Sequence, residues 1–273
     1  MVKSILTITN YSSSNKMTNT SNITKKQLEI LHLLFQFRFL NRPQIQQFLK
    51  HNDRRATNDL LSDLSNKEYI GRIYTETFPE KTKPAVYYLI KGGVKFLKSE
   101  GFDEELLHKL YYEDKRSESF IGQSLLLAEI YLDLSKRKTS EADFKMAIAS
   151  DYPGHELSEL LGDLLPSTYI EQESQEGAAN YFLEILSDDS IERLRKRIKK
   201  YLSFYESNEW EGETSEDFPV ILMICPDLKT LICVKRYLKR KLAEMDAESF
   251  IAQLTIIDKF KDHGLTGDIW EKV

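Results

Sequence analysis

The chain has 273 residues, and the 41% that are apolar are enough for one large domain or two of ordinary size. Its two cysteines, Cys225 and Cys233, form neither a disulfide framework nor a zinc-binding pattern, and no apolar run reaches the length of a membrane span. These features argue against a disulfide-rich secreted protein and a membrane-spanning protein. They predict a cytoplasmic protein. The sequence has no Gly-rich phosphate loop and no HExxH motif, so we expect no cofactor and no metal.

The net charge of −5 hides an uneven distribution along the chain. Residues 1–100 contain 16 Lys and Arg against 8 Asp and Glu, whereas residues 101–273 contain 22 against 35. A basic N-terminal third joined to an acidic remainder indicates a nucleic-acid-binding module attached to a separate scaffold.

Residues 1–22 are predicted to be a disordered tail, because they are mostly polar. Their apolar patch ILTI is too short for a signal sequence. The sequence leaves open whether Met1 or Met17 is the true start.

Residues 23–101 show the pattern of three helices followed by a β-hairpin and a closing helix. Thr24, Asn41 and Asp53 each precede a stretch with helical apolar spacing, where their side chains can cap the helix. The segments RIYTETF and AVYYLI are rich in β-branched and aromatic residues and predict two strands around the loop PEKTKP. This order predicts a winged helix-turn-helix domain.

In a winged helix-turn-helix the first turn of the third helix enters the major groove of duplex DNA. Arginine can contact guanine there, asparagine can contact adenine, and both can hold a phosphate. The residues predicted to bind DNA are Arg54, Arg55, Thr57 and Asn58 from the helix, and Arg72, Lys81 and Lys83 from the hairpin. The alternative is a protein-interaction module, in which the arginines form a solvated first turn.

Residues 102–273 are predicted to form an α/β domain with the order helix, three strands, helix, strand, helix, strand. The first helix spans about residues 117–136, and the strands are DFKMAIAS, STYIEQ, NYFLEIL, FPVILMIC and FIAQLTIID. This order matches the core of the restriction-endonuclease-like fold, whose active site carries a PD-(D/E)xK pattern. The fold class is therefore a two-domain α+β and α/β protein.

Two parts of the chain resemble the replication-relaxation family of plasmid and mobile-element proteins. The first runs from TKKQLEILHLLFQFRFLNRPQIQQFL through RRATNDLLSDLSNKEYIGR to PAVYYLIKGGVKFL, and the second from LPSTYI through NYFLEI to RLRKRIKKYLSFYES. The resemblance implies a DNA-binding accessory protein of plasmid replication or mobilisation. Its implied partners are double-stranded DNA and replication or mobilisation proteins. A homodimer would suit a repeated half-site.

The nuclease motif is degenerate in this sequence. Ser167 stands where the Asp after the proline is expected, and Leu186 stands where the Lys is expected, although Glu184 is retained. A magnesium-dependent nuclease needs the second carboxylate for the metal and the lysine for the attacking water. The sequence therefore predicts no catalytic residues and no enzyme. The alternative is a Mg²⁺-dependent endonuclease in which Asp163 replaces the lost carboxylate.

The run RLRKRIKK contains six basic residues: Arg193, Arg195, Lys196, Arg197, Lys199 and Lys200. Its functional interpretation is a second surface that contacts DNA phosphates. Its alternative is the solvated face of an amphipathic helix. A further alternative for the whole protein is a transcriptional regulator whose acidic domain senses a ligand or partner.

Overall fold

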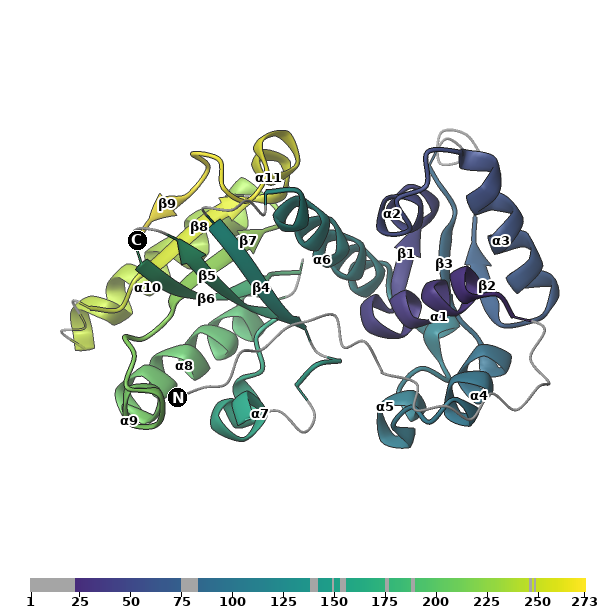
Figure 1. Ribbon diagram of the computed structural model, residues 1–273. Helices are drawn as coiled ribbons and strands as arrows, with labels where there is room; N and C mark the ends of the chain where they lie inside the picture. The colour runs from purple at the N-terminus through teal and green to yellow at the C-terminus, as the bar shows by residue number, and fades with distance from the viewer. Residues whose placement is uncertain are drawn as a thin grey trace. The chain divides into compact units, whose positions relative to one another are not determined.

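The computed structural model describes residues 23–74, 83–137, 142–148, 150–152, 156–174, 177–187, 190–245, 247 and 249–273. It is a mixed structure of helices and two sheets (Figure 1). The chain divides into two compact units that meet in sequence between Leu132 and Asp133. We call them the N-terminal unit and the C-terminal unit. The predicted tail at residues 1–22 lies outside the described residues.

The N-terminal unit begins with three helices: α1 (Lys25–Phe37), α2 (Arg42–Phe48) and α3 (Arg54–Asn66). All three predicted caps are confirmed. The side chains of Thr24, Asn41 and Asp53 accept hydrogen bonds from backbone N–H groups in the first turns of α1, α2 and α3. Each helix therefore starts where its own sequence directs it to start.

A three-stranded antiparallel sheet completes the described core of this unit, with β3 (Val86–Leu89) between β1 (Phe39–Asn41) and β2 (Ile70–Ile73). The strand β1 is absent from the sequence prediction. Helix α4 (Lys91–Ser99) follows β3 and packs tightly on the turn after α3. A Cβ on Gly93 would lie 2.2 Å from the Tyr69 carbonyl oxygen, so this close approach requires glycine.

Residues 102–132 also belong to the N-terminal unit. They contain α5 (Glu104–His108), η2 (Glu113–Lys115) and most of α6 (Glu118–Arg137). Phe102 packs on α1, with its ring centroid 5.0 Å from that of Phe35 and 4.8 Å from that of His32. The predicted domain boundary at residues 101 and 102 therefore differs from the boundary between the compact units, because aromatic packing ties the next 31 residues to α1.

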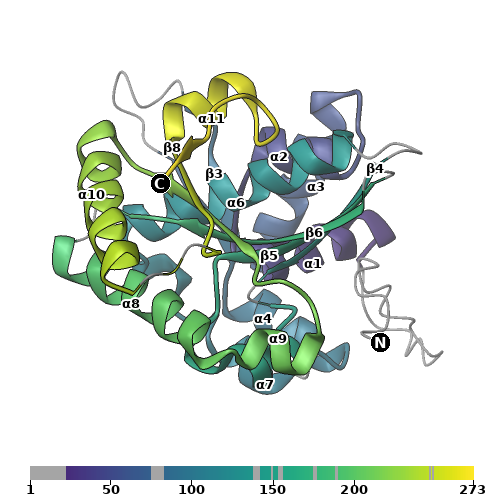
Figure 2. The ribbon, with the colours of Figure 1, turned by 90° about the vertical axis from the view of Figure 1, so that its left-hand side faces the viewer.

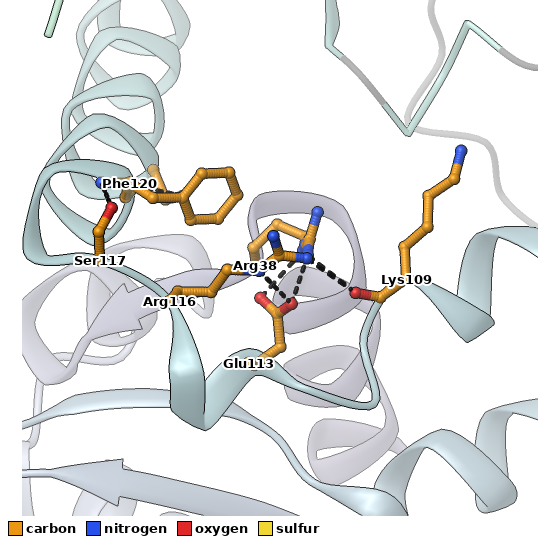
Figure 3. Close-up of polar contacts among 7 residues, drawn as sticks. Arg38, Lys109, Glu113, Arg116, Ser117 and Phe120 are labelled. Atoms are coloured by element: carbon orange, nitrogen blue, oxygen red, sulfur yellow. Dashed lines mark hydrogen bonds and ion pairs between the residues drawn. The ribbon is translucent and has the colours of Figure 1, made fainter. Parts of the chain in front are cut away.

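A buried ion cluster also holds this segment in place (Figure 3). The Glu113 side chain is 1% exposed and accepts hydrogen bonds from the guanidinium groups of Arg38 and Arg116. Both arginines also donate to the Lys109 carbonyl oxygen at 3.1 Å and lie over the Phe120 ring. The cluster thus joins the end of α1 to η2 and to the start of α6.

The C-terminal unit contains a six-stranded sheet among its described residues. Its order is β4 (Ala142–Ile148), β5 (Thr168–Ser174), β6 (Gly177–Ile185), β7 (Val220–Cys225), β8 (Ala252–Ile256) and β9 (Glu271–Lys272). Strands β4, β5 and β6 are antiparallel, β6, β7 and β8 are parallel, and β9 is antiparallel to β8. The strands predicted from the five apolar segments are all present.

The helices of this unit are α7 (Glu156–Leu161), η3 (Gly162–Leu164), α8 (Ile191–Ser207), α9 (Glu209–Thr214), α10 (Leu228–Met245) and α11 (Ile257–His263). Buried side chains of α7, α8, α9 and α10 form one apolar core with one face of the sheet. Figure 2 shows α8 and α10 side by side at that face. At its centre the rings of Phe182 and Trp210 meet edge to face, 5.3 Å apart. This core fixes the positions of α8 and α10.

Candidate nucleic-acid interface

A pocket of about 350 Å³ lies between α2, α3 and the β2–β3 pair of the N-terminal unit. Three of the four basic residues that line it belong to the residues predicted from the sequence to bind DNA. The lining residues are Arg42, Arg54, Asn58, Arg72, Tyr74, Lys83, Pro84, Ala85 and Tyr87. The structure therefore brings together Arg54 and Asn58 of the third helix and Arg72 and Lys83 of the hairpin.

The register of the small sheet explains why these residues converge. Arg72 of β2 pairs with Tyr87 of β3, and the opposite neighbour of β3 is β1, which runs directly into α2. The backbone N–H of Arg42 donates to the Ala85 carbonyl oxygen at 3.3 Å. The first residue of α2 is thereby held beside the segment that enters β3, at the edge of the pocket.

Four cations share this pocket, and none of its lining residues is acidic. Within the described part of the chain, Arg54, Arg72 and Lys83 form no salt bridge. The pKa of Arg42 lies below its ordinary value, because partial burial and the nearby charge of Arg54 both disfavour the charged form. Like charges gathered without a counter-charge are relieved by a bound anion, so the pocket has the electrostatics of an anion-binding site.

Some predicted DNA contacts lie elsewhere. Thr57 is 0% exposed, and its hydroxyl lies 3.2 Å from Nδ1 of His51, so its side chain is not at the surface for the predicted DNA contact. It shares the buried face of α3 with Leu61 and Leu64, which are four and seven residues further along the helix. Arg55 is exposed but does not line the pocket. Lys81 lies outside the described residues.

Arg42 and Tyr74 are the pocket residues that the sequence prediction lacks. Arg42 follows the N-cap Asn41 and looks like an ordinary first-turn residue of α2. Its place in the pocket depends on the pairing of β1 with β3. The three residues of β1 are too few to predict a strand from the sequence. Tyr74 follows β2 and is 47% exposed, with the Arg72 guanidinium 5.7 Å from its ring centroid. An exposed aromatic beside an arginine is the signal that could have revealed it.

In the C-terminal unit, Glu184 lies on β6 and is 8% exposed. One of its oxygens accepts hydrogen bonds from Arg197 Nη2 at 2.8 Å and from the Tyr201 hydroxyl at 2.5 Å. Burial opposes the charge of Arg197, but Glu184 and Tyr201 more than offset this, and the pKa of Arg197 lies above its ordinary value. Burial and the Glu184 carboxylate raise the pKa of Tyr201, which keeps its hydroxyl protonated as a donor.

The residues around Glu184 do not fit a magnesium ion. Ser167 uses its hydroxyl to accept a hydrogen bond from the Ile185 N–H at 3.1 Å, and Leu186 is buried in the apolar core. Asp163 is exposed, and its backbone carbonyl oxygen accepts a hydrogen bond from Lys200 Nζ at 3.1 Å. Among the described residues, no group of three His, Cys, Asp or Glu side chains could hold a metal. Glu184 has a guanidinium as its partner instead.

The chain matches a family model, described as replication-relaxation, over residues 31–221, which is well over half of its length. The chain belongs to the replication-relaxation family. The resemblance stated from the sequence is thereby confirmed. No curated protein matches the chain. Within the described residues of this replication-relaxation protein, no helix combines the length and the apolar character that crossing a membrane requires.

The six basic residues of the run on α8 fall into two groups in this replication-relaxation protein. Arg197 points inward to Glu184 and to the Leu165 carbonyl oxygen, which it contacts at 2.6 Å. The other five are exposed: Arg193, Arg195, Lys196, Lys199 and Lys200. The structure therefore sets Arg197 apart from the predicted DNA-contacting surface, because its guanidinium is engaged within the fold.

Proposed function

We propose that this replication-relaxation protein binds duplex DNA through its N-terminal unit, which acts as a winged helix-turn-helix. The observation that carries the proposal is the pocket in which Arg42, Arg54, Arg72 and Lys83 converge with no acidic lining residue. Family membership supports a role in replication or mobilisation of a plasmid or another mobile element. The protein would be an accessory factor that holds DNA for that machinery.

The cations of the pocket and the side chains of Arg55 and Asn58 would have different tasks on DNA. Arginine binds a phosphate through two parallel N–H groups, so Arg42, Arg54 and Arg72 would hold one backbone segment with Lys83 beside it. Arg55 and Asn58 are exposed in the first turns of α3 and would face base edges in the major groove. Phosphate contacts would set the position, and base contacts would set the preference for a sequence.

The C-terminal unit would serve as a scaffold of restriction-endonuclease-like type, without nuclease activity. The salt bridge between Glu184 and Arg197 supports this proposal, because the Arg197 guanidinium and the Tyr201 hydroxyl already occupy one oxygen of the carboxylate. Such a scaffold could form a homodimer or contact replication or mobilisation proteins. The test is whether the purified protein nicks supercoiled plasmid in the presence of Mg²⁺. Nicking that is lost in Glu184→Ala would show that the unit is a nuclease and would contradict this proposal.

The test is fluorescence anisotropy of a labelled duplex against the full chain over a series of salt concentrations. The variant Arg54→Gln/Arg72→Gln/Lys83→Gln removes three pocket charges. The control Lys25→Gln/Lys91→Gln/Lys95→Gln removes three exposed charges of the same unit, none of which lines the pocket.

If each pocket cation holds one phosphate, the slope of log affinity against log salt should fall by roughly 3 in the pocket variant and little in the control. Equal slopes in both variants would refute the pocket as the DNA site. Absence of binding by the wild type at low salt would refute DNA binding itself.

A further inference from the structure

The outer faces of α8 and α10 form a second basic surface, on a unit whose sequence is acidic. Residues 133–273 carry 19 Lys and Arg against 28 Asp and Glu, so a concentration of positive charge stands out on this unit. We define the α8–α10 surface as Arg195, Lys196, Lys199, Arg236, Lys239 and Arg240, all of which are exposed. The two helices lie side by side on one face of the sheet (Figure 2).

Tyr237 joins the two helices at the centre of this surface. The guanidinium carbon of Arg195, from α8, lies 5.5 Å from the ring centroid, and that of Arg240, from α10, lies 5.4 Å from it. The ring is 7% exposed, and its hydroxyl has no hydrogen-bond partner among the described residues. Tyr237 is therefore a fixed aromatic support for two arginines, and it reduces the conformational entropy that they lose on binding.

The charges of this surface are mostly available to a ligand. Arg240 forms one salt bridge, to Glu244 at 3.6 Å, in which both side chains are at least half exposed. Exposed pairs of this kind contribute little and are readily exchanged for another anion. Within the described residues, Arg195 and Arg236 form no salt bridge at all. By contrast, Lys235 and Lys241 of the same helix are paired with Glu271 and Glu244.

We propose that the α8–α10 surface is a second binding site for the phosphate backbone of duplex DNA, centred on the Arg195–Tyr237–Arg240 stack. Arginines held on an aromatic ring keep their N–H donors directed outward, in the fork that matches a phosphate. The inference takes its ligand from the proposed function but rests on residues of the other unit. Two separate sites would let one molecule hold two segments of DNA, and the linked contacts would raise the total affinity.

The experiment compares two variants of the full chain with the same loss of charge. Arg195→Gln/Arg236→Gln removes one unpaired arginine from each helix of the surface. Lys136→Gln/Lys261→Gln removes two exposed lysines of the same unit, from α6 and α11. The probe is a long labelled duplex, and binding is measured by anisotropy between about 50 and 200 mM salt.

We expect the surface variant to lose about tenfold in affinity and about 2 in salt slope, because each phosphate contact contributes about 0.9. The control should retain the wild-type slope. Equal losses in the two variants, or no loss in the surface variant, would overturn the inference. A third variant, Arg195→Lys/Arg236→Lys, keeps the charge and should retain the slope.

The pocket variant Arg54→Gln/Arg72→Gln/Lys83→Gln separates the two proposals. If it abolishes binding and the surface variant binds like the wild type, the second site fails and the proposed function stands. If the surface variant loses affinity and the pocket variant does not, the pocket fails and the second site stands. A protein that binds through both sites loses affinity in each variant and most in their combination.

Discussion

The pocket of the N-terminal unit and the Glu184 site of the C-terminal unit both gather arginine side chains, but only the second supplies a carboxylate. Arg197 is paired with Glu184 at 2.8 Å in an environment that excludes most solvent. Burial and the nearby charge of Arg54 lower the pKa of Arg42, and no acidic residue lines their pocket. An arginine that is paired with a carboxylate inside the unit stabilises the fold. Arginines that converge without a carboxylate are able to bind an anion instead.

Removal of the Glu184 carboxylate should have the largest effect on stability. Glu184→Ala leaves Arg197 partly buried without its partner, and breaking such a pair lowers the free energy of unfolding by about 3–5 kcal/mol. Urea denaturation followed by tryptophan fluorescence measures this loss, because Trp210 lies in the same core. A loss no larger than that of an exposed salt bridge would show that the pair has no structural role.

The paired variant Glu184→Gln/Arg197→Met is the matched control for this prediction. It removes both charges and keeps similar volumes, and replacement of a whole buried pair is often close to neutral. We therefore expect it to be more stable than Glu184→Ala. The opposite order would mean that the ionic contact itself, and not the avoidance of an orphaned charge, holds this region together.

Arg42 should show the reverse behaviour, with an effect on binding and little effect on stability. Arg42→Gln removes one of the four pocket cations, and we expect about a tenfold loss of DNA affinity with a decrease of about 1 in the salt slope. The control is Lys50→Gln, an exposed lysine just beyond the other end of α2. If Arg42→Gln also lowers the melting temperature strongly, its weaker binding would result from a less stable fold, and Arg42 would have a structural role.

Thr57 tests whether burial or sequence position decides which residues of α3 contact DNA. Thr57→Val keeps the shape of the side chain but deletes the hydroxyl that lies 3.2 Å from His51. We expect a loss of about 1 kcal/mol in the free energy of unfolding and an unchanged affinity for DNA. A clear loss of DNA affinity in a variant of normal stability would show that Thr57 contributes to DNA binding despite its burial.

Glu171 on β5 gives the smallest expected effect and a pH dependence of defined sign. Burial raises the pKa of its carboxyl group, and Lys145 at 3.8 Å offsets this only in part. A raised pKa in the folded state means that the stability from Glu171 is fully present below its unfolded pKa and is lost as the pH rises through the folded value. Glu171→Gln should flatten this decline between mildly acidic and neutral pH, as measured by thermal unfolding.

The control for Glu171 is Glu173→Gln. It removes the carboxylate that Lys145 contacts at 2.7 Å and leaves Glu171 in place. The decline in stability with rising pH should persist in this variant. A flattened profile in Glu173→Gln as well would assign the pH dependence to the whole cluster around Lys145.

Local signals in the sequence predicted the elements well, because those signals act within one turn or one strand. The caps at Thr24, Asn41 and Asp53 each depend on backbone groups at most three residues away. The continuous apolar sequence of β7 predicts a buried central strand from its composition alone. Such features need no knowledge of the rest of the chain.

The structure differs from the sequence prediction mainly at residues whose position depends on distant partners. Arg42 reaches the pocket only because β1 pairs with β3, more than 40 residues later in the chain. Arg197 does not join the other exposed basic residues of α8, because its guanidinium contacts Glu184 on strand β6. Thr57 is different, since the spacing to Leu61 and Leu64 already placed it on the buried face of α3. Helical periodicity therefore predicts its burial better than its nearness to Arg54 and Arg55 predicts a DNA contact.

The attachment of residues 102–132 to the N-terminal unit determines where the protein can be divided. The side chains of Phe120 and Tyr131 pack on Phe39 and Phe37, and the Leu125 carbonyl oxygen accepts a hydrogen bond from Gln44 at 2.8 Å. A fragment that ends at Gly101 would expose these aromatic rings and leave Arg38 without its carboxylate. The N-terminal unit should therefore be expressed as a piece that extends into α6, because a fusion made at the end of α4 would remove the partners of these buried groups.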